Sequence, residues 1–122
     1  MSALRDLVVE LVETHRALSA MALEARIDPT RRPEVVRLRK RSAEAVQRVI
    51  AAIDEDGQLQ ADPELARQFR DKFSEMRARI AIFQAKWPAV LLSHDDDEFA
   101  SDRERLRALD KPVTDWALLV LR

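Results

Sequence analysis

Cysteine is absent from the 122 residues, glycine occurs once, and tyrosine does not occur. Without cysteine the chain has no disulfide, no zinc–thiolate site and no thiol nucleophile. The scarcity of glycine argues against a sheet protein, whose turns usually need several glycine or asparagine residues. Alanine, arginine and leucine are the commonest residues instead, and all three are strong helix formers. The composition therefore predicts an all-α protein.

Long hydrophobic runs are also missing, since the longest uninterrupted apolar stretch covers only residues 116–121. A membrane-spanning helix needs about 20 apolar residues, so we expect no association with a membrane. The first residues do not form a basic segment followed by an apolar core. We therefore expect no secretory signal and a location in the cytoplasm.

Neither sign of charge dominates, because 21 Lys and Arg residues almost balance 22 Asp and Glu residues, for a net charge of -1. A chain with this balance has no overall field that would draw it onto nucleic acid or acidic membranes. The length favours one domain over residues 1–122, and we find no internal repeat or linker that would divide it.

Apolar residues recur at three- and four-residue steps in several segments, which is the periodicity of amphipathic helices. The first helix is expected over 2–27, with Ser2 as its N-terminal cap and an end before Pro29. The second is expected over 33–54, closed by Gly57 in a left-handed conformation. Together with the later segments, this spacing predicts an antiparallel bundle of four to five helices.

Two prolines decide how many helices the second half of the chain contains. A third helix is expected to begin at Asp62 and Pro63, and its apolar stripe stays in phase past Pro88 to about Leu92. The stripe of the last helix likewise stays in phase across Pro112. A proline within a helix removes one hydrogen bond and clashes with the preceding turn. We therefore expect a kinked continuation at Pro88, and a kink or a break at Pro112.

Two patterns suggest a metal site at first sight. The acidic run Asp95–Glu98 beside His94 offers the oxygen ligands of Mg²⁺ and Ca²⁺, but consecutive helical residues point in different directions. We expect these acids to cap the helix that follows. His15 lies at the edge of the first apolar face, without the Glu-x-x-His repeats of di-iron bundles, and is expected to be a half-buried structural histidine. The sequence thus predicts neither a metal nor another cofactor.

Cations outnumber acids between Arg31 and Arg48, which is the strongest charge signal in the chain. Four of them share one side of the expected second helix: Arg37, Lys40, Arg41 and Arg48. A phosphate backbone could bind this side, but no aromatic residues are interleaved and no helix-turn-helix spacing is present. The competing interpretation is a solvated face, or one that pairs with acidic segments of the same chain. Nucleic acid is therefore the disfavoured partner.

The C-terminal segment 112–122 is apolar almost all round, and such a helix must be buried on more than one side. It lies either at the centre of its own bundle or against a partner. Val113, Trp116, Leu119 and Val120 are expected to face the core, and Leu118 and Leu121 then project elsewhere. An exposed Trp116 would dominate an interface. Trp87 belongs to an aromatic stripe that is expected to lie mostly in the core, and beside Pro88 it could instead open onto a groove for an amphipathic helix. The predicted partner-binding residues are Trp87, Trp116, Leu118, Leu119 and Leu121.

These patterns favour a non-enzymatic protein-interaction module, an adaptor, regulator or small chaperone that binds another protein or a second copy through an apolar helical surface. In size and helix layout the chain resembles the small cytosolic export chaperones of bacterial secretion and flagellar systems. This resemblance implies a protein-binding function and assigns no role to any residue. The alternative is a nucleic-acid-associated regulator that uses the basic side of the second helix.

Overall fold

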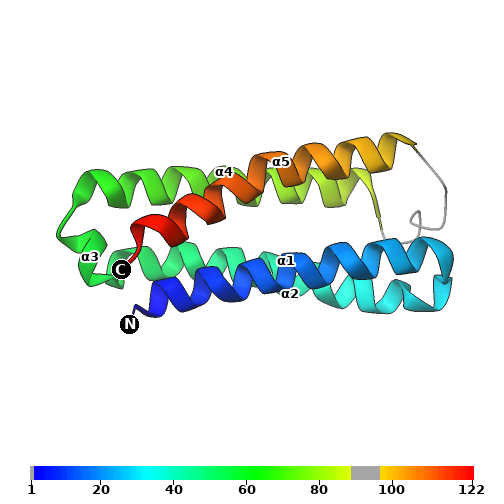
Figure 1. Ribbon diagram of the computed structural model, residues 1–122, viewed down its shortest axis with the longest axis horizontal. Coiled ribbons are helices and arrows are strands. Elements are labelled where there is room, and N and C mark those ends of the chain that lie inside the picture. The colour runs from blue at the N-terminus through cyan, green and yellow to red at the C-terminus, as the bar shows by residue number, and fades with distance from the viewer. Residues whose placement is uncertain (1, 89–96) are drawn as a thin grey trace.

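The computed structural model describes residues 2–88 and 97–122, and within these ranges it contains five α-helices and no strand (Figure 1). The four long helices are α1 (Ala3–Ile27), α2 (Arg32–Ala52), α4 (Pro63–Lys86) and α5 (Asp97–Val120), and successive ones run antiparallel. The connections contain the short helix α3 (Gly57–Gln60) and two 3-10 turns, Pro29–Arg31 and Ile53–Glu55. The predicted all-α bundle of four to five helices is confirmed.

Local capping signals set several helix ends. The Ser2 hydroxyl accepts a hydrogen bond from the Arg5 backbone N–H and caps α1, as predicted. At the start of α4, Asp62 accepts from the Leu65 N–H and Pro63 occupies the first turn. Each cap satisfies a backbone donor that has no partner within the helix.

The left-handed cap expected at Gly57 is wrong. No glycine has a positive φ in the described residues, and Gly57 begins α3 instead of ending α2. The chain leaves α2 through the 3-10 turn Ile53–Glu55, and Asp56 then adopts an extended conformation. Because Asp56 caps α3 by accepting from the Leu59 N–H, the chain reverses without a left-handed residue.

The two prolines behave differently. The continuation through Pro88 is wrong within the described residues, because α4 ends at Lys86 and Trp87 already has a non-helical backbone (φ -122, ψ 72). The clash between a proline and the residue before it disfavours the helical conformation there. The remainder of the expected continuation, residues 89–92, lies outside the described residues.

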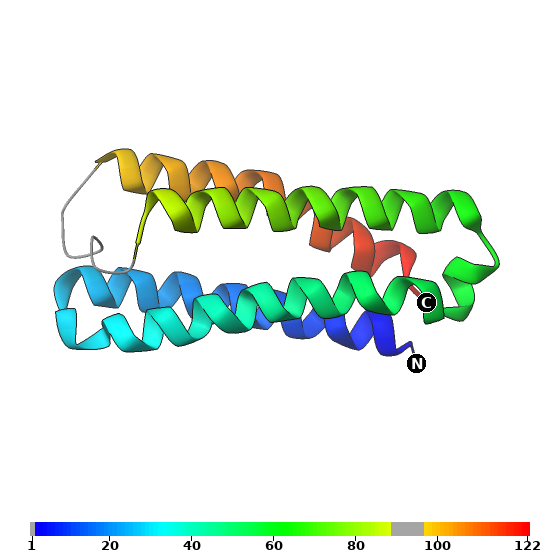
Figure 2. The ribbon, with the colours of Figure 1, turned by 180° about the vertical axis from the view of Figure 1, so that it is seen from behind.

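Pro112, in contrast, lies inside the single helix α5, so of the kink or break expected there the break does not occur. Figures 1 and 2 show that the axis of α5 changes direction along its length. Its N-terminal half runs beside α4, and its C-terminal part slants toward α1. Pro112 is exposed, so its ring occupies the solvent side of the bend, where the missing backbone hydrogen bond costs least.

The core has two parts along the bundle. The larger part unites all four long helices and α3, and its largest fully buried side chains are Phe69, Phe73, Leu4, Leu11, Ile53, Leu59 and Met76. The smaller part lies toward the C-terminal end of α1 and consists of Ala25, Val35, Trp87 and Phe99. The Trp87 and Phe99 rings meet edge to face, with centroids 5.4 Å apart, a favourable aromatic geometry.

Candidate functional site

The five apolar residues predicted to bind a partner do not form one exposed surface. Trp87, at the end of α4, lies at the opposite end of the bundle from the C-terminus of α5 (Figure 1). Its side chain is buried and its Nε1 donates a hydrogen bond to the Asp102 carboxylate at 3.0 Å. This tryptophan therefore anchors the start of α5 onto the end of α4.

The expected facing of the C-terminal segment is wrong at two positions. Leu119 is 84% exposed, whereas Leu121 is only 5% exposed and belongs to the larger core. The buried positions of this part of α5 are Thr114 and Ala117, and Leu121 continues that row at a four-residue step. Leu119 lies on the opposite side of the helix and points to solvent.

Trp116 and Leu118 are half-buried. The Trp116 ring packs on Phe69 with centroids 4.7 Å apart, and the Lys72 ammonium lies 5.1 Å from its centre. The Leu118 carbonyl accepts a hydrogen bond from the Arg5 guanidinium at 2.8 Å. Both residues thus have partners within the bundle.

The residues of the predicted basic side of α2, Arg37, Lys40, Arg41 and Arg48, are all exposed. Arg37 pairs with Glu34 of the same helix, and Arg48 pairs with Glu10 of α1 at 3.2 Å. Lys40 and Arg41 have no ion-pair partner in the part of the chain that the structure describes.

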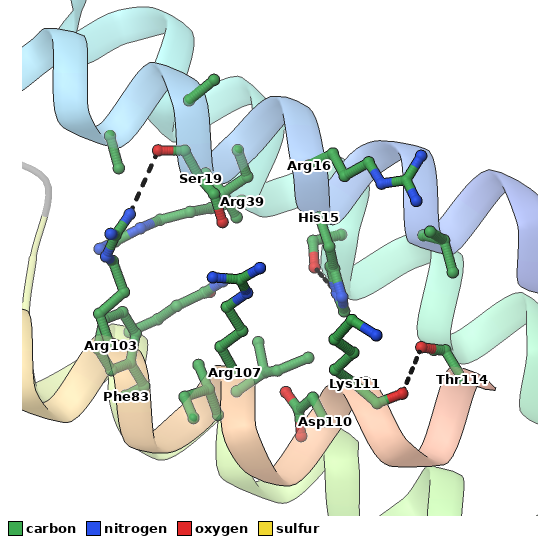
Figure 3. A pocket seen from close by; sticks show the side chains of 18 of the residues that line it. His15, Arg16, Ser19, Arg39, Phe83, Arg103, Arg107, Asp110, Lys111 and Thr114 are labelled. Atoms are coloured by element: carbon green, nitrogen blue, oxygen red, sulfur yellow. Dashed lines mark hydrogen bonds between the residues drawn. The ribbon is translucent and has the colours of Figure 1, made fainter. Parts of the chain in front are cut away.

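A cleft of about 420 Å³ lies between α1 and α5, over a floor supplied by α2 and α4 (Figure 3). Its α1 wall covers residues 12–23, which corresponds to about 16 Å along the helix axis. The apolar side chains that line it include Leu18, Ala22, Ile80, Phe83, Phe99 and Leu106. Rim residues on both walls are exposed, so the cleft is open to solvent along its length.

α1 and α5 contact each other differently toward the two ends of the bundle. At the closed end, Leu4, Val8 and Ala117 share one core, and Arg5 bonds to the backbone of α5. At the open end, the long side chain of Arg103 spans the gap, with its Nη1 atom 3.4 Å from the Ser19 carbonyl oxygen. Toward this open end, Ala25 of α1 and Phe99 of α5 still belong to the smaller core, and the cleft lining extends along α5 as far as Asp115.

Cations outnumber acids around this cleft. The cations are Arg16, Arg39, Arg103, Arg107 and Lys111. The two acids are Asp110, which bonds to Arg79 at 2.9 Å, and Asp115, which bonds to Lys111 at 2.6 Å. Burial raises the pKa of Asp110 to about 6, although the hydrogen bond and charge of Arg79 oppose this shift. The cleft consequently presents a net positive charge to an occupant.

His15 lies in the wall of the cleft, and its Nε2 is 3.0 Å from the Ser42 hydroxyl oxygen. Burial lowers the pKa of His15 to about 4, so the imidazole is neutral at pH 7. The predicted half-buried position of this histidine is confirmed. Ser42 is fully buried in the middle of α2, where the helix already uses the backbone N–H groups that an oxyanion would need. We interpret the pair as mutual satisfaction of two buried polar groups.

Within residues 2–88 and 97–122, no cluster of His, Asp and Glu side chains could hold a metal ion. Over the same ranges, no helix has the length and apolarity to cross a membrane. Of the acidic run, Asp97 and Glu98 lie in the first turn of α5, and Glu98 bonds to Lys86 at 2.8 Å. The remainder of that pattern, residues 94–96, lies outside the described residues.

Comparison with models of protein families, with curated proteins and with solved structures finds no match. The fold and the cleft define the class of protein by themselves. This is an all-α bundle of four long helices with an apolar, cation-lined cleft between the first and the last of them.

This cleft was not predicted from the sequence. One usable signal was present, because Arg103, Arg107 and Lys111 follow one another at four-residue steps and must share one side of a helix. Whether that side faces solvent or another helix depends on how α5 lies against α1. The placement of α5 against α1 depends on packing between helices, which the spacing of residues along the chain does not determine.

Proposed function

We propose that this chain is a non-enzymatic protein-interaction module, and that a helical segment of a partner protein binds in the cleft between α1 and α5. The observation that supports the proposal is an open apolar trough between two long helices. Apolar surface that is left open to water in this way is typical of a binding site. The site differs from the C-terminal residues predicted from the sequence, most of which are occupied within the bundle.

The shape of the cleft favours a helix as the occupant. The α1 wall is about 16 Å long, which equals roughly three turns of an α-helix. Arg16, Ala20 and Leu23 on one rim and Arg107 and Lys111 on the other are exposed. An amphipathic helix can lie along such an opening and place its apolar side chains in the groove.

An adaptor, a regulator and an export-chaperone-like protein would all use such a cleft, and they differ in the partner that it receives. A second copy of the chain is the other occupant consistent with the sequence analysis. The cytoplasm is part of the same proposal, and fractionation of the native host tests it.

The test uses a neutral, fluorescein-labelled amphipathic peptide with leucines along one face and glutamine elsewhere, and fluorescence anisotropy reports its binding. Wild type should bind it with a dissociation constant below about 1 mM, the limit of weak binding. Ala20→Trp fills the cleft from an exposed rim position and should abolish binding. Ala43→Trp makes the same change at an exposed position outside the cleft and should leave binding intact.

Failure of wild type to bind this peptide, or equal binding by the two tryptophan variants, would contradict the proposal. Circular dichroism of both variants checks that the bundle is intact, so that a loss of binding reports the cleft and not unfolding.

A second candidate function is association with nucleic acid through α2. It is favoured by Lys40 and Arg41, which are exposed and have no ion-pair partner among the described residues. Retention on DNA or RNA should then fall steeply with salt. Joint replacement of Arg37, Lys40 and Arg41 by glutamine should remove the retention, and retention that survives this change excludes the candidate.

A further inference from the structure

Three cations form a regular row along one wall of the cleft. Arg103, Arg107 and Lys111 are spaced by four residues on α5, and all three line the cleft. Figure 3 shows their side chains extending from α5 toward α1. Each step corresponds to about 6 Å along the helix axis, so the row extends over about 12 Å. We refer to these three residues as the cation row.

The other charges around the cleft do not neutralise this row. Arg16 on the opposite rim adds positive charge and has no ion-pair partner among the described residues. Asp110 is directed to Arg79, a side chain that does not line the cleft. Asp115 pairs with Lys111 in an exposed contact of 2.6 Å, and an exposed pair of this kind contributes little stability. An incoming carboxylate can therefore replace it at little cost.

The remaining contacts of the row are equally replaceable. Arg107 reaches Glu104 at 4.0 Å, with both side chains about two-thirds exposed. Arg103 reaches the Ser19 carbonyl oxygen at 3.4 Å across the mouth of the cleft. An occupant that supplied carboxylates at these positions would replace weak contacts with stronger charge-assisted hydrogen bonds.

We propose that the partner segment is an acidic amphipathic helix with Glu or Asp at four-residue steps along the flank that faces α5. This inference rests on the proposed function. A bound helix has the same rise per residue as α5, so acids at positions i, i+4 and i+8 match the spacing of the cation row. Its apolar side chains enter the cleft beside them. Cations spread over about 12 Å cannot converge on one carboxylate, and this spacing disfavours a fatty acid or another amphiphile with a single charged group.

The experiment compares two labelled peptides with the same leucine face. One carries Glu at i, i+4 and i+8 beside that face, and the other carries Gln at these positions. The acidic peptide should bind wild type about tenfold more tightly at low salt. The advantage should shrink as the salt concentration rises from about 0.05 M to about 0.5 M, because ions screen exposed charges.

Matched variants locate the effect. Arg107→Gln removes a member of the cation row and should weaken binding of the acidic peptide by about threefold to tenfold, with the neutral peptide unaffected. Arg105→Gln removes an exposed arginine of the same helix that does not line the cleft and should change neither affinity. Glutamine is a good helix former, so both variants should keep α5 intact.

The outcomes separate this inference from the proposed function. If the two peptides bind equally, the acidic partner is refuted and the binding module stands. If neither binds, the proposed function itself fails. Displacement of the acidic peptide by a long-chain fatty acid, at an affinity equal to or tighter than that of the peptide, would assign the cleft to a small amphiphile. A dimer that sedimentation detects in wild type and not in Ala20→Trp would assign it to a second copy. Either result overturns the inference.

Discussion

Two titratable side chains at the cleft, the half-buried His15 and the buried Asp110, should make the stability of the bundle respond to acid in opposite directions. The pKa of His15 falls from 6.5 to about 4, and the pKa of Asp110 rises from 3.8 to about 6. For His15 the unfolded chain binds the proton more readily, so its contribution to stability is present above pH 6.5 and is lost as the pH falls toward 4. For Asp110 the folded protein binds the proton more readily. The cost of burying the ionised carboxylate is therefore fully present above pH 6, and it disappears as the pH falls toward 3.8.

The two effects are close in size. Since one pKa unit corresponds to 1.36 kcal/mol, the linkage relation gives roughly 2 kcal/mol for each group between about pH 7 and 4.5. On acidification over this range, His15 should lower the free energy of unfolding by this amount and Asp110 should raise it by the same amount. The wild-type protein should therefore show little net dependence on pH from this pair.

Single substitutions should expose the two slopes. Relative to wild type, Asp110→Asn should lose roughly 2 kcal/mol of unfolding free energy on acidification from about pH 7 to 4.5. His15→Gln, which retains a hydrogen-bonding group near Ser42, should gain roughly the same amount over this range. Other carboxylates titrate equally in all three proteins, so their contributions cancel in the differences.

Urea unfolding at several pH values measures these differences, provided that the dependence on urea concentration stays the same in all three proteins. A constant offset between variant and wild type reports lost contacts, and only the change of that offset with pH tests the argument. An offset for Asp110→Asn that does not vary with pH would refute the reasoning, because Arg79 would then keep the carboxylate ionised throughout. An invariant offset for His15→Gln would show that water reaches the imidazole in the folded state.

Four further substitutions test the packing and the chain reversal by urea unfolding. Gly57→Ala should raise the free energy of unfolding by about 0.4–1 kcal/mol, because Gly57 has no positive φ and open space surrounds the added Cβ; a loss of stability would indicate a left-handed residue. Phe69→Ala should lower the free energy of unfolding by about 3–5 kcal/mol, because Phe69 is fully buried. Ile82→Ala, at a 69% exposed position, should change it by less than about 0.5 kcal/mol. Equal effects of the two substitutions would contradict the assigned core. Trp87→Phe should lower the free energy of unfolding by about 1 kcal/mol, because the hydrogen bond to Asp102 is lost. An unchanged free energy of unfolding would mean that this bond contributes nothing.

Local signals predicted the helices well because helix ends depend on neighbouring residues. Ser2, and Asp62 with Pro63, begin α1 and α4 through contacts within one turn, and the sequence contains everything that such contacts need. The apolar periodicity likewise depends only on spacing along the chain. These features made the all-α bundle predictable.

Features that depend on packing between helices were harder to predict. The apolar stripe stays in phase across both Pro88 and Pro112, but only at Pro88 is the preceding residue a buried tryptophan, packed on Phe99 and bonded to Asp102. The same dependence explains the reversed facing of the leucines near the C-terminus. It also explains the missed cleft, whose lining comes from four helices.

The division of the core gives this protein two separate optical reporters. With no tyrosine in the chain, its two tryptophans dominate ultraviolet emission, and they lie in different parts of the bundle. Trp87 belongs to the smaller core beside the open end of the cleft, and Trp116 packs on Phe69 at the closed end. A variant that keeps only one of them would report the unfolding of its own end. Comparison of the two variants would then reveal whether the bundle unfolds as one cooperative unit or opens first where α1 and α5 diverge.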